Sequence, residues 1–158
     1  MTHADLVKLA ARWLAKKHPV VVTEMSSGAM EEPDAIGFAG GLSTLVECKA
    51  SRADFHADRH KPFNRLGHWR YYLTPRGLVT AEEIPPGWGL LWAENRQRSP
   101  LQILESTGFA QWNARGENAL LVSCLRRVRP AQEQLRLSVR YYTIPNKCRA
   151  TLGVQGIA

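Results

Sequence analysis

Residues 33–49 read PDAIGFAGGLSTLVECK, and this stretch predicts a hairpin of two short strands joined by a tight turn at Gly40-Gly41. Side chains alternate across a strand, so Glu47 and Lys49 share one face of the second strand, with their Cα atoms about 7 Å apart. If the strands pair, Asp34, near the start of the first strand, lies close to Glu47, near the end of the second. The sequence therefore predicts that two carboxylates and one ammonium group converge at one end of the hairpin.

Pro33-Asp34, followed by Glu47-Cys48-Lys49, resembles the signature of the PD-(D/E)XK nuclease superfamily, and most closely its MmcB-like DNA-repair branch. In that branch the strand that carries the lysine leads into a helix resembling residues 51–59. The resemblance covers about residues 4–75. It implies an α/β fold with a restriction-endonuclease-like αβββαβ core, in which helices flank a central mixed sheet. It also implies a divalent-metal-dependent DNA endonuclease that hydrolyses phosphodiester bonds.

The residues of the motif suit a Mg²⁺ site, with Mn²⁺ as the substitute ion. Mg²⁺ binds through one or two carboxylates and keeps several waters, and Asp34 and Glu47 fit that ligand role. The backbone carbonyl of Cys48 offers a further oxygen, whereas its side chain is expected on the opposite face, in the core. Lys49 is then the cation that steadies developing charge or orients the attacking water. The alternative interpretation is a cross-strand salt bridge beside an exposed carboxylate.

A fourth member of the site, another acidic residue, is expected. Nucleases of the resembled class often carry another acidic residue before the aspartate, commonly on the first helix. Here the first predicted helix offers only Asp5, near its start, whereas Glu24 comes at the end of the first predicted strand. We expect Glu24 to act as a metal ligand and catalytic carboxylate, with Asp5 left open as the substitute. The alternative for Glu24 is a plain surface glutamate.

Basic residues that follow the motif are candidates for phosphate contacts, although each alone is more often a solvated charge. They are Arg52, Arg59, Lys61 and, on the next predicted strand, Arg70. The formal net charge of +7 suits a polyanionic partner. DNA is the expected partner, and RNA stays open because its processing uses the same chemistry. A non-cleaving nucleic-acid-binding module with a nuclease fold is the other alternative.

The composition is that of one globular domain. At 158 residues the chain is long enough to bury a core, and residues 95–158 are expected to complete the domain with a helix and a tail. No apolar run approaches the ~18 residues that a membrane span needs, and the N-terminus lacks a secretory signal. Three cysteines without metal-type spacing indicate a reducing compartment, the cytoplasm of a bacterial or phage-infected cell. A homodimer stays open.

Hydrophobic spacing and chain breakers predict the order of helices and strands. Helices are expected from Thr2 to Pro19, from Ser51 to Pro62 and over 118–128, where Pro130 closes the helix, with a helical turn at 80–83. Strands are expected over 20–25, 34–38, 43–49, 69–73, 89–92 and 101–104, and 135–144 is either a strand or a helix-to-strand tail. The order helix, three strands, helix, strand is that of an α/β sandwich around a mixed sheet.

Overall fold

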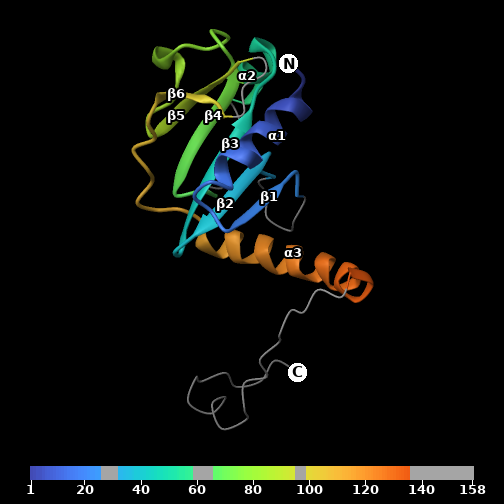
Figure 1. Cartoon of the computed structure of the whole chain (residues 1–158). Helices are drawn as coiled ribbons and strands as arrows, with labels where there is room; N and C mark the ends of the chain where they lie inside the picture. Colours follow the sequence, from blue (N-terminus) through green and yellow to red (C-terminus); the bar gives the residue numbers. More distant parts are fainter. Residues whose placement is uncertain (26–31, 59–65, 95–98, 136–158) are drawn as a thin grey trace. The chain divides into compact units, whose positions relative to one another are not determined.

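The computed structural model describes residues 1–25, 32–58, 66–94 and 99–135, and only the backbone of residues 58 and 128–135. Its contacts divide the chain into two compact units, Met1–Arg126 and Arg127–Ala158. The first unit contains the sheet, and the single domain expected over the whole chain stays a prediction. Figure 1 shows the order of the elements along the chain.

Within the described residues, six strands form one mixed sheet in which spatial order follows sequence order. The strands are β1 (Val20–Thr23), β2 (Ala35–Ala39), β3 (Leu42–Cys48), β4 (Trp69–Pro75), β5 (Trp88–Ala93) and β6 (Leu101–Leu104). β1, β2 and β3 pair antiparallel, β3, β4 and β5 run parallel, and β6 is antiparallel to β5. The predicted α/β class with a central mixed sheet flanked by helices is confirmed. So is the order α1 (His3–Leu14), β1, β2, β3, α2 (Arg52–Asp58), β4.

Helix α1 begins with a capping box formed by Thr2 and Asp5. The Thr2 hydroxyl accepts the Asp5 N–H at 3.2 Å, and the Asp5 carboxylate accepts the Thr2 N–H at 2.9 Å. The backbone and side chain of Thr2 lower the pKa of the exposed Asp5 carboxyl. Because its carboxylate already closes the helix start, Asp5 has a structural role at the N-terminus of α1.

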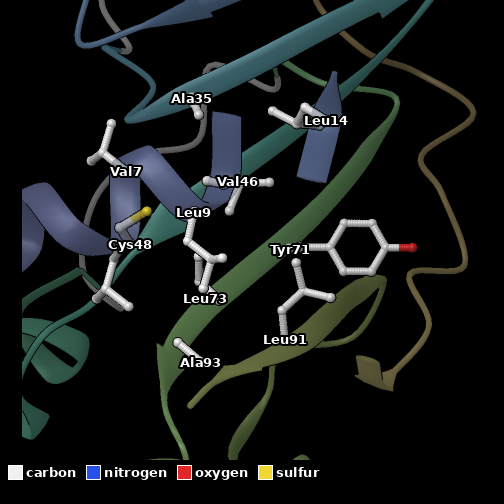
Figure 2. Packing of buried hydrophobic residues seen from close by; sticks show 12 residues of the cluster. Val7, Leu9, Leu14, Ala35, Val46, Cys48, Tyr71, Leu73, Leu91 and Ala93 are labelled. Atoms are coloured by element: carbon white, nitrogen blue, oxygen red, sulfur yellow. The ribbon is translucent and has the colours of Figure 1, made fainter. Parts of the chain in front are cut away.

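Two buried apolar clusters, one on each face of the sheet, join it to the helices. On one face α1 packs against β2 to β5, as Figure 2 shows for Val7, Val46 and Leu73. On the other face the cluster includes Phe55 of α2 and Leu120 of α3 (Ala114–Leu135). Residues on the two faces alternate along β3, as a pleated strand requires. The sheet is therefore covered on both sides, which is the arrangement typical of parallel strands.

The crossovers that join the parallel strands place three strand ends together. β3 connects to β4 through α2, and β4 connects to β5 through residues 76–87, which include the short 3₁₀ helix η1 (Ala81–Glu83). Phe55 and Val79, one from each crossover, pack in the same cluster, so both crossovers cover the same face. Because β3, β4 and β5 are parallel, their carboxyl ends meet at one edge of the sheet, where ligand sites of α/β folds usually lie.

Several predicted boundaries are wrong, among them those of β1 and α3. β1 ends at Thr23 rather than Met25, because Glu24 adopts a left-handed conformation with φ of 46°, which a strand cannot continue. Helix α3 begins at Ala114, four residues early, and continues past Pro130 to Leu135. A proline removes one helical hydrogen bond and strains the preceding turn, but this does not end the helix here. None of the helices in the described residues is long and apolar enough to cross a membrane.

Candidate metal-dependent site at the end of the central hairpin

The predicted hairpin is present and brings Asp34 to the end of β3. β2 and β3 pair with Ala35 opposite Val46, so Asp34, one residue before β2, comes opposite Glu47. The Asp34 side chain is half-buried, and its Oδ2 accepts the backbone N–H of Cys48 at 2.7 Å. This short, charge-assisted hydrogen bond fixes the carboxylate beside the main chain between Glu47 and Lys49.

Glu47 and Lys49 form a buried ion pair. The Lys49 Nζ lies 3.3 Å from Glu47 Oε2, and the two residues are only 5% and 8% exposed. The backbone N–H of Lys49 donates to the carbonyl of Leu73, which ties the end of β3 to β4. Burying two charges costs more desolvation than an apolar pair of the same size, so the pair is a poor device for stability alone. Such costly charges concentrate at functional sites.

Burial is the main cause of the raised pKa values of two neighbouring groups, the Asp34 carboxyl and the Cys48 thiol. Burial raises the pKa of the Asp34 carboxyl, while the N–H of Cys48 and the charges of Lys49 and His3 act in the opposite direction. Burial, reinforced by the nearby carboxylates of Asp34 and Glu47, raises the pKa of the Cys48 thiol far above its usual range. Cys48 lies in the α1-facing cluster, as predicted, so its thiol is a core group and only its backbone carbonyl is a candidate ligand.

His3 is a member of the site that the sequence reasoning missed. Its Nε2 lies 3.4 Å from Asp34 Oδ1 and 4.0 Å from Glu24 Oε1. Glu24 itself is exposed, and its backbone N–H donates to the carbonyl of Asp34 at 3.0 Å. The only sequence signal for His3 was its place at the start of α1. The first residue of a helix that covers the sheet can reach the end of the neighbouring strands.

The structure places the predicted phosphate-binding residues in different environments. Arg52 is exposed, but its guanidinium donates to the Leu78 carbonyl at 2.8 Å and pairs with Glu83. The prediction for Arg70 is wrong: Arg70 is 2% exposed, with its guanidinium 4.3 Å from the ring centroid of Trp88, so it packs in the core. Its position on a strand covered on both faces explains that burial. Arg59 and Lys61 lie outside the described residues.

The carboxylates at this edge are of the donor class that a hard divalent cation prefers. The side chains of Asp34 and Glu47 supply carboxylate oxygens from the β2 and β3 sides of the strand pair, and Mg²⁺ prefers such oxygens while keeping several waters. Within the described ranges, no three His, Cys, Asp or Glu side chains are arranged to hold a metal ion. Glu24 is therefore not assembled with the other two carboxylates into a three-ligand set. Asp34 and Glu47 remain the two side chains that would hold Mg²⁺.

Comparison with known proteins supports the fold alone. No protein-family model matches the chain, and neither does any curated protein. Among solved structures, the chain is similar to the SPO1766 protein of unknown function from Silicibacter pomeroyi. The two share 21% sequence identity and superpose with a TM-score of 0.64, over 89% of this chain and 99% of the other.

Proposed function

We propose that this protein is a divalent-metal-dependent endonuclease that hydrolyses phosphodiester bonds in DNA, with Asp34, Glu47 and Lys49 at its centre. The observation that carries the proposal is the hydrogen bond from the Cys48 N–H to Asp34. That bond holds one carboxylate against the residue that separates Glu47 from Lys49. Two acidic groups and one cation thus converge at the end of a buried strand.

Each residue has a distinct role in the proposed reaction. Asp34 and Glu47 would hold the Mg²⁺, and the backbone carbonyl of Cys48 would add a further oxygen. A bound Mg²⁺ supplies charge neutralisation to the phosphate and lowers the pKa of a coordinated water. Lys49 keeps a positive charge fixed in a buried position, where it stabilises negative charge that develops on the phosphate oxygens.

A nicking assay on supercoiled plasmid over a Mg²⁺ and Mn²⁺ titration tests the proposal. Lys49→Gln should reduce the cleavage rate by about 10²–10³, the typical value of one positioned transition-state charge. Extra metal should not restore it, whereas Asp34→Asn should regain part of its rate with more Mg²⁺ or Mn²⁺. The matched control is Lys8→Gln, an equal loss of charge at an exposed position on α1. Because Lys49 is buried, circular dichroism must confirm that each variant is folded.

The same assay separates the alternatives. If no divalent ion supports cleavage of DNA or RNA by the wild type, or if Lys49→Gln cleaves as fast as the wild type, the nuclease proposal fails. Binding without cleavage, with a log–log salt slope of about −0.9 per neutralised phosphate on duplex DNA, would identify a binding module. Cleavage confined to RNA substrates would identify an RNA-processing nuclease.

The proposed setting is DNA repair, recombination or phage–host conflict in the cytoplasm of a bacterial or phage-infected cell. Three cysteines without metal-type spacing support a reducing compartment. Sedimentation with and without a short duplex would establish whether a homodimer forms.

A further inference from the structure

A pocket of about 410 Å³ lies on the face of the sheet that α1 covers, where β3 and β4 begin. Glu47 and Lys49 come at the other end of β3. The pocket volume falls within the range of small-molecule sites. Its lining includes three aromatic and three exposed polar side chains: Trp13, Trp69, Tyr71, Lys17, Gln102 and Glu105.

The aromatic wall of this pocket is held in place by the core. The rings of Trp13 and Tyr71 pack edge to face, with centroids 5.3 Å apart and an interplanar angle of 71°. Trp69 packs against the same α1-facing cluster and against the ring of His68, at a centroid distance of 4.5 Å. Figure 2 shows the Tyr71 hydroxyl directed away from the cluster. A ligand would meet aromatic surface that is already ordered, which lowers the entropic cost of binding.

The polar rim carries three different hydrogen-bonding groups. Lys17, just after α1, is a cation with three donors, and Glu105, just after β6, is an acceptor with two oxygens. Gln102 on β6 offers both a donor and an acceptor. An aromatic wall with one cation and one carboxylate on its rim matches a planar heterocycle that carries hydrogen-bond donors and an attached anion.

Nucleotides have this combination of groups. A base stacks on aromatic side chains, a phosphate pairs with a lysine, and a carboxylate accepts hydrogen bonds from the amino edge of a base. Guanine presents two adjacent donors on its Watson–Crick edge, and cytosine and adenine present one amino group each. Uracil presents a single ring N–H between two carbonyl oxygens, which a carboxylate repels. A carboxylate at the rim therefore favours guanine and disfavours uracil.

We propose that this pocket binds one nucleotide, either free or within a single strand, with its base against Trp13, Trp69 and Tyr71. Its amino edge faces Glu105 and its phosphate lies near Lys17. The pocket shares no residue with the proposed cleavage site, so nucleotide binding goes beyond the nuclease proposal and does not depend on it.

Calorimetric titration in EDTA tests this proposal with GMP, CMP, AMP and UMP, and with ribose 5-phosphate as the ligand that lacks a base. GMP should bind most tightly and UMP least tightly among the four nucleotides. Ribose 5-phosphate should bind about 5- to 150-fold more weakly than GMP, which is the value of one stacked base. A short guanine-rich single strand, compared with GMP, distinguishes a strand from a free nucleotide as the source of the ligand.

Variants at the rim and inside the pocket complete the test. Lys17→Gln should weaken every phosphate ligand, Glu105→Gln should remove the preference over UMP, and Ala39→Phe should fill the pocket and abolish binding. Lys8→Gln is the charge-matched control on α1 and should bind nucleotide as the wild type does. Lys49→Gln, a change at the proposed cleavage site, should also leave nucleotide binding unchanged, so the two proposals can fail separately. Absence of binding by GMP and the strand alike, or equal binding of GMP and ribose 5-phosphate, overturns the proposal. So does unchanged binding by Ala39→Phe.

Discussion

Two buried glutamates, at opposite ends of β3, have contrasting surroundings. Glu117 of α3 is 7% exposed and accepts hydrogen bonds from neutral donors, the Ser43 hydroxyl at 2.5 Å and the Gly67 N–H at 2.8 Å. Glu47 is buried to a similar degree but pairs with the charged Lys49, and Asp34 comes opposite it in the sheet. Burial alone therefore does not distinguish the two carboxylates, whereas the second carboxylate and the buried cation beside Glu47 do.

The neutral network around Glu117 explains its structural role. Ser43 lies at the start of β3, and its hydroxyl also accepts the backbone N–H of His68 at 3.1 Å. Glu117 thus ties three segments together: β3, the residues before β4, and the first turns of α3. Leu120, one turn further along α3, is fully buried in the cluster on the same face. The first turns of α3 therefore contribute to the core.

The largest expected effect is a loss of cleavage when the charge of Glu47, but not that of Glu117, is removed. Glu47→Gln removes a proposed metal ligand and should reduce cleavage by about 10²-fold or more, since even indirect partners of a metal are worth 10–100-fold. Glu117→Gln keeps an acceptor oxygen and should cleave plasmid at the wild-type rate. Both variants are compared per folded molecule in the same nicking assay. Equal losses in the two variants would contradict the contrast between the two sites.

A stability effect should appear at the other end of the strand. Glu117→Ala removes the acceptor of two buried donors, Ser43 and Gly67, and should lower the free energy of unfolding by about 1–3 kcal/mol. Urea denaturation measures the change, and Glu117→Gln should lose less because its amide oxygen can still accept. A Glu117→Ala variant as stable as the wild type would mean that the network does not hold α3 to the sheet.

The sequence predicted the hairpin because its signals are local. Alternation along residues 33–49 and the Gly40-Gly41 turn determine which residues pair, and the register places Asp34 opposite Glu47. Whether a charged residue is buried, in contrast, could not be predicted from local sequence. Arg70 has the charge expected of a phosphate contact, but it lies on the central strand β4. Its stacking on Trp88 depends on β5, which follows later in the chain. His3 was missed for the same reason, since its proximity to Asp34 is a long-range contact.

A smaller effect should follow from the backbone of Glu24. Its φ of 46° is a left-handed conformation that costs a non-glycine residue about 1 kcal/mol or more. Glu24→Gly should therefore raise the free energy of unfolding by up to about 1 kcal/mol, as measured by urea denaturation, while cleavage falls if the carboxylate contributes to the site. Glu24→Gln keeps the backbone cost and is the matched control. Increased stability with unchanged cleavage would assign Glu24 to the surface and not to the metal site.

The smallest effect should be the pH dependence contributed by Asp34. Burial raises the pKa of its carboxyl above the ordinary value of 3.8, so over the interval above that value the folded protein retains a proton that the unfolded chain has released. The free energy of unfolding therefore falls as the pH rises through this interval, and the loss persists at neutral pH. Asp34→Asn cannot release a proton, and its amide oxygen can still accept the N–H of Cys48. Measured in EDTA by urea denaturation, its stability relative to the wild type should increase from pH 3 to pH 7. A difference that does not change with pH would show that burial is offset by Lys49, His3 and the hydrogen bond from Cys48.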